Sequence, residues 1–141
     1  MPGSGKTIIA EAAKNLGIYV FNMGDVIREE CIKRNLPSNT ETYTLIMKNI
    51  RNQYGPQIVA KRTYEKISVK TDLVCIDGVR SLEEVEFFKK VGDKVYILAV
   101  ISSFSTRLKH LLSRNRTGDP KNYDEIQIRD KSELRLSLIH I

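Results

Sequence analysis

Apolar residues along this chain occur either at helical spacing or in short continuous runs. The helical spacing predicts helices over seven stretches, which are residues 5–17, 24–35, 41–56, 57–67, 81–92, 104–116 and 125–138. The continuous runs predict strands over 18–23 ("IYVFNM"), 72–77 ("DLVCID") and 94–101 ("KVYILAVI"). Strands that are apolar on both faces and separated by helices indicate an α/β fold with a parallel sheet covered on both sides.

Several helix ends carry their own signals. We expect the first helix to stop at Gly17, and the second to be capped by Asp25 and to end before Pro37. Ser81 and Glu84 have the spacing of a capping box, which places the start of a helix at that serine.

The 141 residues are enough for one domain, and we treat 1–141 as a single unit. Residues 25–68 form a helical insertion between two strands that is long enough to be a substrate-binding flap. Tyr43, Met47 and Tyr54 lie at helical spacing inside it, and we expect them to be packing residues of the flap rather than a shelf on which a base stacks.

The chain has 23 basic and 17 acidic residues, a net charge of +6, which favours an anionic partner. Composition does not separate a nucleic acid from a small polyphosphate. No segment has the length of a membrane span, and Cys31 and Cys75 lack metal-ligand spacing, so we expect a reduced, cytoplasmic protein with Cys75 as a small core residue.

The chain opens "MPGSGKT", which matches the end of the phosphate-binding pattern G-x-x-x-x-G-K-[ST]. In such a loop backbone amides turn inward around phosphate oxygens, and we assign this role to residues 2–5, namely Pro2, Gly3, Ser4 and Gly5. Lys6 would reach the β- and γ-phosphates of ATP, and the Thr7 hydroxyl would hold Mg²⁺.

Asp77 ends the apolar run at 72–77, and a carboxylate at the carboxyl end of a buried strand can hold Mg²⁺ opposite a phosphate loop. The alternative is that Asp77 caps the turn that follows.

Counting back from Gly5, the first glycine of the loop pattern falls one position before Met1, and the strand that feeds such a loop lies further upstream. The tail "LSLIHI" also breaks the preceding helical pattern. We therefore expect a chain that lacks both ends of its fold, is unstable alone and is nearly inactive.

Four blocks, "MGDVIREE", "GPQIVAKRT", "IDGVRSLEEVE" and "RNRTGDPKNYDEIQIRDKSEL", resemble a mainly archaeal family of P-loop nucleotide kinases. That family is similar to adenylate and cytidylate kinases and to dephospho-CoA kinase. The resemblance covers Pro2 to about Leu134. It implies a P-loop NTPase fold of the nucleoside-monophosphate-kinase type, with three α/β/α layers, a parallel sheet, an acceptor-binding helical insertion and a short lid.

The resemblance also implies roles for charged residues. Arg28, in "GDVIR", is similar to the arginine that holds the acceptor phosphate in monophosphate kinases. Arg80, in "DGVR", is similar to the arginine that grips that phosphate near the point of transfer. Asp25 has two open roles: a helix cap in a monophosphate kinase, or the base that accepts a ribose hydroxyl proton in the dephospho-CoA kinase pattern.

A lid over residues 114–130 is implied by the same resemblance, with Arg114, Arg116 and Arg129 closing over the phosphates of ATP. Arg107 belongs either to this lid or to a solvated helix face. His110 is expected at the surface or at the edge of the core, without a ligand role.

The leading hypothesis is therefore an enzyme that uses ATP and Mg²⁺ to phosphorylate a nucleotide or nucleotide-like acceptor. The alternatives are transfer to a ribose hydroxyl, as in dephospho-CoA kinase, and a non-catalytic ATP-binding regulator. A nucleic-acid partner is disfavoured because the arginines gather at loop and lid positions rather than along one stripe, and no aromatic-basic RNA motif occurs. A GTPase is disfavoured because no "NKxD"-like motif occurs.

Overall fold

The computed structural model describes residues 3–68, 71–114 and 122–134, and it contains seven helices and two strands in that part of the chain. In chain order they are α1 (Lys6–Asn15), β1 (Tyr19–Asn22), α2 (Gly24–Lys33), α3 (Thr40–Tyr54), α4 (Ile58–Tyr64), β2 (Val74–Asp77), α5 (Leu82–Val91), α6 (Phe104–Arg114) and α7 (Tyr123–Leu134).

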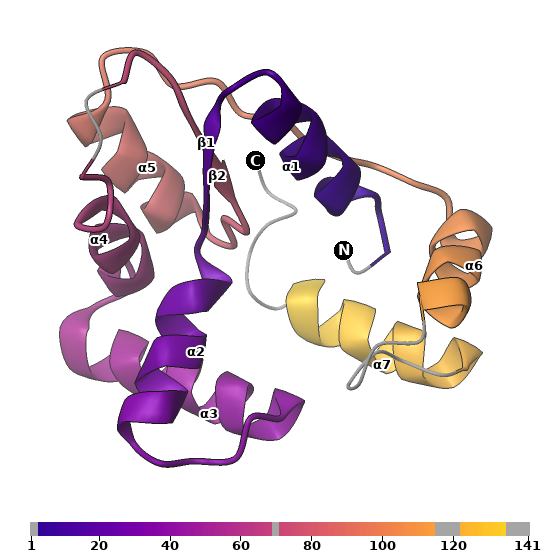
Figure 1. The fold of residues 1–141 in the computed structure, drawn as a ribbon. Coiled ribbons are helices and arrows are strands. Elements are labelled where there is room, and N and C mark those ends of the chain that lie inside the picture. Colours follow the sequence, from indigo (N-terminus) through magenta and orange to yellow (C-terminus); the bar gives the residue numbers. More distant parts are fainter. Residues whose placement is uncertain (1–2, 69–70, 115–121, 135–141) are drawn as a thin grey trace.

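The two strands form a parallel pair, with Tyr19 opposite Val74 and Asn22 opposite Asp77. Helix α1 lies on one side of this pair, and α4 and α5 lie on the other (Figure 1). Both strands run toward α2, so their carboxyl ends and the start of α1 lie at the same edge of the sheet (Figure 1). The parallel α/β arrangement expected from the sequence is thus present in the described residues as a two-stranded sheet.

The main hydrophobic core lies between α2, α3, α4 and α5 rather than over the sheet. Its buried members are Met23, Val26, Ile27, Cys31, Ile46, Ile50, Val59, Ala60 and Phe88. Tyr43 and Met47 pack against this core, as predicted for flap packing residues. Tyr54 does not, because it is largely exposed and instead lies against the guanidinium of Arg62.

The strand predicted over residues 94–101 is wrong for this structure: the segment is extended but belongs to no sheet. Its apolar side chains are mostly open to solvent, with Tyr96 at 85% and Ile101 at 89% exposure. A strand needs a neighbour to pair its N–H and C=O groups, and in the described residues β2 pairs with β1 alone. The apolar run has the composition of a strand, but it makes no hydrogen-bonded pair with another strand in the described residues.

Helix boundaries follow the capping signals in most places. Ser81 accepts from the Glu84 amide and the Glu84 carboxylate accepts from the Ser81 amide, which confirms the capping box. Helix α1 ends just before Gly17, whose φ of +76° is the left-handed conformation that suits glycine.

Helix α2 departs from the predicted boundaries. Asp25 is not its cap: Met23 occupies that position, and Asp25 lies in the first turn, where its charge still suits the helix dipole. The helix ends at Lys33, well before Pro37, because Asn35 turns the chain with a φ of +52°.

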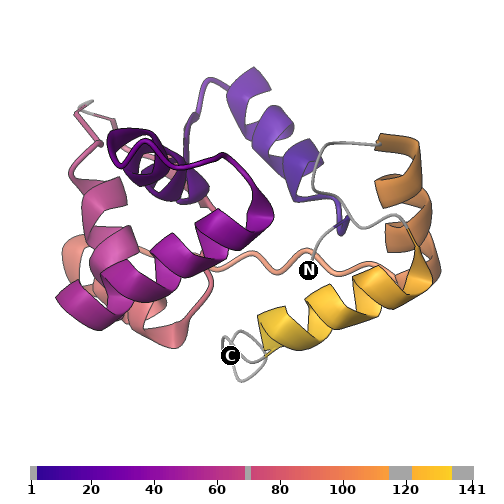
Figure 2. The same ribbon diagram turned by 90° about the horizontal axis from the view of Figure 1, so that it is seen from below.

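Helices α6 and α7 form a separate pair beyond the extended segment (Figure 2). Arg107 of α6 and Asp130 of α7 make a bidentate ion pair, and the rings of Phe104 and Tyr123 pack in a tilted arrangement with 4.7 Å between their centroids. Cys75 is half-buried in β2 and not a fully buried core residue, whereas Cys31 is fully buried. No helix in the described ranges combines the length and the apolar character that crossing a membrane requires.

Candidate functional site

The predicted phosphate loop is a sharp turn that leads directly into α1. Gly3 and Gly5 have φ values of +74° and +96°, which side chains other than hydrogen rarely permit. Gly5 is the N-cap of α1 and makes no side-chain cap, and the first turn of α1 contains no acidic residue. The amides at this helix start therefore suit an anion.

Close packing fixes this turn against α6. A β-carbon on Gly3 would lie 2.7 Å from the carbonyl oxygen of Arg107 and 3.0 Å from Cγ of Leu111. His110 also contacts the loop, with Nδ1 3.0 Å from the carbonyl oxygen of Gly3. The loop thus rests on α6, and the exposed His110 is at the edge of it rather than in a ligand cluster.

Lys6 and Thr7 begin α1, as the loop pattern requires. The ammonium of Lys6 donates to the hydroxyl of buried Ser4 at 3.4 Å, so the lysine folds back over the loop. Thr7 is exposed at the first turn. Pro2 lies outside the described residues.

The carboxyl ends of the two strands are joined by one side chain. Nδ2 of Asn22 donates to Oδ2 of Asp77 at 2.9 Å, and Oδ1 of Asn22 accepts from the Gly24 amide at 2.8 Å. A β-carbon on Gly24 would lie 2.8 Å from Oδ1 of Asn22 and 3.1 Å from Nη1 of Arg28, so a larger residue here would displace these two side chains. The Asp77 carboxylate points toward Asn22 rather than acting as a cap for the turn at Gly78.

Asp25 and Arg28 form an ion pair at the start of α2. Nε of Arg28 donates to Oδ1 of Asp25 at 3.0 Å, Nη2 donates to the same oxygen, and Nη2 also lies 3.5 Å from Oδ1 of Asn22. Both side chains are about half exposed. The two predicted acceptor-side residues are therefore together, and Asn22 connects them to Asp77.

Arg80 lies in the turn between Asp77 and α5, with its backbone amide 2.7 Å from Oε2 of Glu84. Its side chain is half-buried. The turn itself depends on Gly78, which has a φ of +94°, a backbone conformation that residues with a side chain rarely adopt.

The alternative that Arg107 lies on a solvated helix face is wrong, and the ion pair of Arg107 joins α6 to Asp130 at the end of the predicted lid. Its side chain is 6% exposed and is committed to Asp130, with Phe104 beneath the guanidinium. Arg116 and most of the predicted lid lie outside the described residues, as do the side chains of Arg114 at the end of α6 and Arg129 within α7.

The oxygen ligands proposed for Mg²⁺, the Thr7 hydroxyl and the Asp77 carboxylate, are of the type that this ion prefers. In the described ranges no three His, Cys, Asp or Glu side chains gather as a metal cluster. A pair of oxygen ligands of this kind fits a Mg²⁺ ion that is held by one or two protein oxygens together with phosphate and water. It does not fit a closed structural metal site.

Burial and the nearby charge of Asp77 raise the pKa of the Cys75 thiol above its ordinary value, so the thiol stays protonated at neutral pH. Cys75 is thus not a nucleophile, in agreement with a site that works through charge and positioning.

Three residues of the site were missed by sequence reasoning: Asn22, Gly24 and Arg51, the last of which pairs with Glu84. A signal existed for Asn22, since a polar residue ends an apolar strand at the edge where Asp77 ends its own. No local signal marks Arg51, because its partner lies 33 residues away.

The family comparison agrees with this geometry. Residues 1–127 match the family described as AAA domain, and the phosphate loop at the start of a helix beside a parallel sheet is the arrangement that P-loop NTPases use. The chain belongs to this P-loop NTPase-like family.

The chain is also similar to proteins named UPF0200 from archaea. It is 45% identical to the one from Staphylothermus marinus, over 98% of this chain and 72% of that protein. It is 41% identical to the one from Hyperthermus butylicus, over 98% and 74%, and 39% identical to the one from Pyrococcus abyssi, over 98% and 76%. Membership of the P-loop family implies that the chain binds a nucleotide.

Proposed function

We propose that this protein is a cytoplasmic ATP-dependent kinase that transfers the γ-phosphoryl group to a nucleotide or nucleotide-like acceptor. The observation that carries the proposal is the edge at which β1, β2 and α1 meet. At this edge lie the start of α1, whose first turn has no acidic residue, and the carboxylate of Asp77, which the Asn22 side chain joins to the Asp25–Arg28 pair.

Phosphoryl transfer needs charge placed around the moving group more than it needs covalent chemistry. In the proposal the amides of Gly3, Ser4 and Gly5 and the ammonium of Lys6 bind the phosphates of ATP. Thr7 and Asp77 hold Mg²⁺, which neutralises charge that develops on the phosphate oxygens.

On the acceptor side, Arg28 binds the phosphate of the acceptor and Arg80 stabilises the group in transfer. Residues 25–68 are proposed as the acceptor-binding insertion and 114–130 as the lid, with Arg114, Arg116 and Arg129 around the phosphates of ATP.

A monophosphate acceptor is favoured over a ribose hydroxyl by the state of Asp25. Two nitrogens of Arg28 donate to one oxygen of Asp25. Both donors share that oxygen, so the carboxylate is occupied by the guanidinium, which it orients toward an anion. We therefore propose that Asp25 positions Arg28, and that dephospho-CoA kinase-like transfer, with Asp25 as base, is the second candidate.

The test begins with ATP binding. Saturable binding of ATP·Mg²⁺ in calorimetry would contradict the expectation that this chain is unstable and nearly inactive alone, and would support the loop assignment. Lys6→Ala should then weaken binding at least about tenfold, since a charge-assisted contact is worth roughly 1.5–3 kcal/mol. Lys14→Ala is the matched control, because Lys14 is an exposed lysine at the opposite end of the same helix. Equal affinity of the two variants would contradict the loop assignment.

The acceptor is then identified by ATP consumption with AMP, CMP, dAMP, UMP and dephospho-CoA, in parallel for this chain and for the Staphylothermus marinus relative. Arg28→Ala should raise KM for a monophosphate and leave KM for ATP unchanged, whereas Asp25→Asn should keep most of kcat. Loss of kcat in Asp25→Asn with dephospho-CoA would select the second candidate. ATP binding without turnover of any acceptor would select a regulator.

A further inference from the structure

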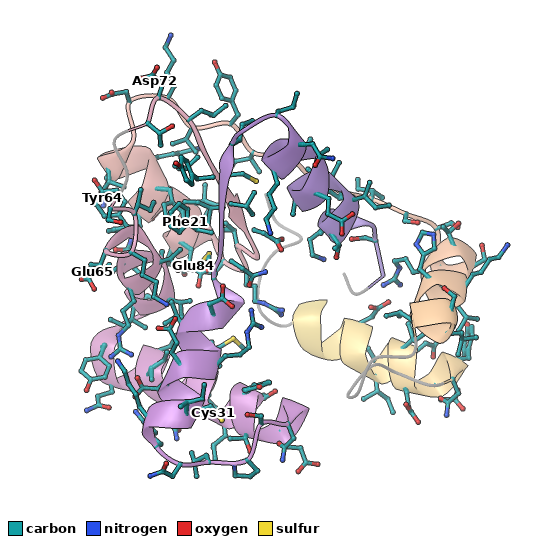
Figure 3. The ribbon with its side chains drawn as sticks, viewed as in Figure 1. Phe21, Cys31, Tyr64, Glu65, Asp72 and Glu84 are labelled. Atoms are coloured by element: carbon teal, nitrogen blue, oxygen red, sulfur yellow. The ribbon has the colours of Figure 1, made fainter. Side chains whose placement is uncertain are left out.

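A carboxylate with no solvent exposure lies at the start of α5. Glu84 is 0% exposed, and Figure 3 labels it where α5 faces the helical insertion. Its Oε2 accepts from the backbone amides of Arg80 at 2.7 Å and Ser81 at 3.2 Å, while Oε1 accepts from Nη2 of Arg51 at 2.6 Å. One side chain therefore binds the Arg80 turn on one oxygen and helix α3 on the other.

Helix capping accounts for only part of this arrangement. A capping box needs the reciprocal bonds between Ser81 and Glu84, and these use Oε2 alone. Burying the carboxylate with Arg51 as its partner has a desolvation cost for both charges, which buried ion pairs often fail to recover as stability. The cost is visible at Arg51, whose Nε is buried with no hydrogen-bond partner among the described residues.

The pair also joins two parts of the site that are far apart in sequence. Arg51 comes from α3 in the proposed acceptor-binding insertion, and the Arg80 amide lies directly after the end of β2. The insertion has a second, partly buried pair, Arg62 with Glu30, but this one joins α4 to α2 and leaves the Arg80 turn untouched. Of these two pairs, Arg51 with Glu84 is the one that reaches the turn.

We propose that Arg51 and Glu84 are positioning residues that couple the helical insertion to Arg80. The position of the insertion then determines the position of Arg80, which stabilises the phosphoryl group in transfer. This role rests on the proposed kinase function. Arg51 contacts neither nucleotide in the proposal, and it acts through Glu84 and the backbone amide of Arg80.

The experiment compares Arg51→Met with the control Arg62→Met, which removes the partly buried pair of the insertion. Hydrogen exchange at the Arg80 and Ser81 amides is measured by NMR in this chain, without any acceptor. Arg51→Met should accelerate exchange at these amides about tenfold or more, because their shared acceptor loses its anchor. Arg62→Met should leave them within about twofold of the wild type.

The turnover number kcat is a second readout, which a loss of stability alone does not change as long as the protein stays folded. With the acceptor that the screen identifies, Arg51→Met should lower kcat about tenfold or more and leave the Kd of ATP unchanged, since misplacement of a charged group costs turnover. The double variant Arg51→Met/Glu84→Gln removes the unpaired buried charge. It should recover most of the melting temperature but not kcat or amide protection.

Unchanged exchange at Arg80 in Arg51→Met, or equal acceleration in Arg62→Met, would overturn the inference. So would recovery of kcat together with stability in the double variant, because the pair would then be purely structural. If the wild type binds ATP but phosphorylates no acceptor, the kinase proposal fails, and the exchange data still decide whether the insertion is coupled to the Arg80 turn.

Discussion

Nδ2 of Asn22 donates a hydrogen bond to Oδ2 of Asp77 across the ends of two parallel strands, at 2.9 Å. The same side chain accepts from the Gly24 amide, and its Oδ1 lies 3.5 Å from Nη2 of Arg28. One amide group therefore orients the proposed metal carboxylate on one side and the start of the acceptor-binding helix on the other. An asparagine fits this position because it offers a donor and an acceptor at once.

Replacing Asn22 with aspartate should destabilise the protein in a pH-dependent way. Asn22→Asp keeps an acceptor for Gly24 but places a second carboxylate against Asp77, which costs roughly 1–3 kcal/mol while both are ionised. Lowering the pH toward 5 protonates one member of the pair and reduces the cost. The measurement is thermal unfolding at pH 8 and pH 5 in a buffer without divalent cations.

Asn22→Ala is the control for this prediction. It removes both hydrogen bonds without adding a charge, so its loss of melting temperature should be nearly the same at the two pH values. A pH-independent loss in Asn22→Asp as well would mean that the carboxylates do not face each other.

How far the sequence alone predicts this structure depends on how local each signal is. Gly17, Ser81 and Glu84 mark helix ends through contacts within four residues, and the structure confirms them. The loop at Gly3 and Gly5 is equally local, because φ and the helix start are set by neighbouring residues. Asp77 ends β2 as predicted, because the apolar run that marks the strand stops at this residue.

The features that the sequence did not predict depend on residues that are distant in the chain. The run at 94–101 has strand-like composition, but a strand exists only beside another one. Arg107 does not lie on a solvated helix face, because it forms a largely buried ion pair with Asp130, 23 residues later. Arg51 was missed because its pairing with Glu84, 33 residues away, follows no spacing rule, whereas Asn22 carried a signal as the polar residue that ends an apolar strand.

Two glycines with the same backbone conformation should respond differently to alanine. Gly3 and Gly17 have φ values of +74° and +76°, so each Gly→Ala change adds about 1–2 kcal/mol of left-handed strain. Only Gly3→Ala also forces a β-carbon to within 2.7 Å of the Arg107 carbonyl, whereas Gly17 has nothing within 4 Å. We expect Gly3→Ala to cost roughly 1–3 kcal/mol more in urea unfolding and to weaken ATP binding.

Equal unfolding free energies for Gly3→Ala and Gly17→Ala would show that the loop does not rest on α6. Loss of stability in Gly3→Ala with unaltered ATP affinity would separate the packing of the loop from its role as a phosphate cradle.

Arg107 should matter for stability and not for ATP. Its side chain is 6% exposed and pairs with Asp130, which is 14% exposed, so Arg107→Ala leaves a largely buried carboxylate without its partner. Breaking a buried pair from one side costs roughly 3–5 kcal/mol. Thermal unfolding should therefore show a large decrease in melting temperature, while calorimetry at a temperature where the variant is folded gives the wild-type Kd for ATP.

The double variant Arg107→Leu/Asp130→Leu is the control, since it removes both charges and should regain much of the lost stability. A Kd for ATP that increases more than about tenfold in Arg107→Ala would instead show that Arg107 contacts the phosphates of ATP, because that is the effect of losing a charge-assisted phosphate contact.

The acid dependence of stability should include a component from Glu30. Hydrogen bonds from Arg34 at 2.8 Å and Arg62 at 2.9 Å, together with their charges, hold the pKa of this carboxyl below its ordinary value of 4.5. Because the folded pKa is the lower one, the ionised form stabilises the folded protein above pH 4.5, and this contribution is lost as the pH falls through the folded pKa. Glu30→Gln should therefore lower the unfolding free energy at pH 7 by about 1 kcal/mol or less, and the difference from wild type should shrink steadily below pH 4.5.

Glu86→Gln serves as the comparison, because Glu86 is exposed on α5 and its removal should change stability by less than about 0.5 kcal/mol at either pH. Urea unfolding at pH 7, 4.5 and 3.5 measures all three proteins. A Glu30→Gln deficit that stays constant down to pH 3.5 would show that packing between α2 and α4, and not the ionised carboxylate, is what the substitution removes.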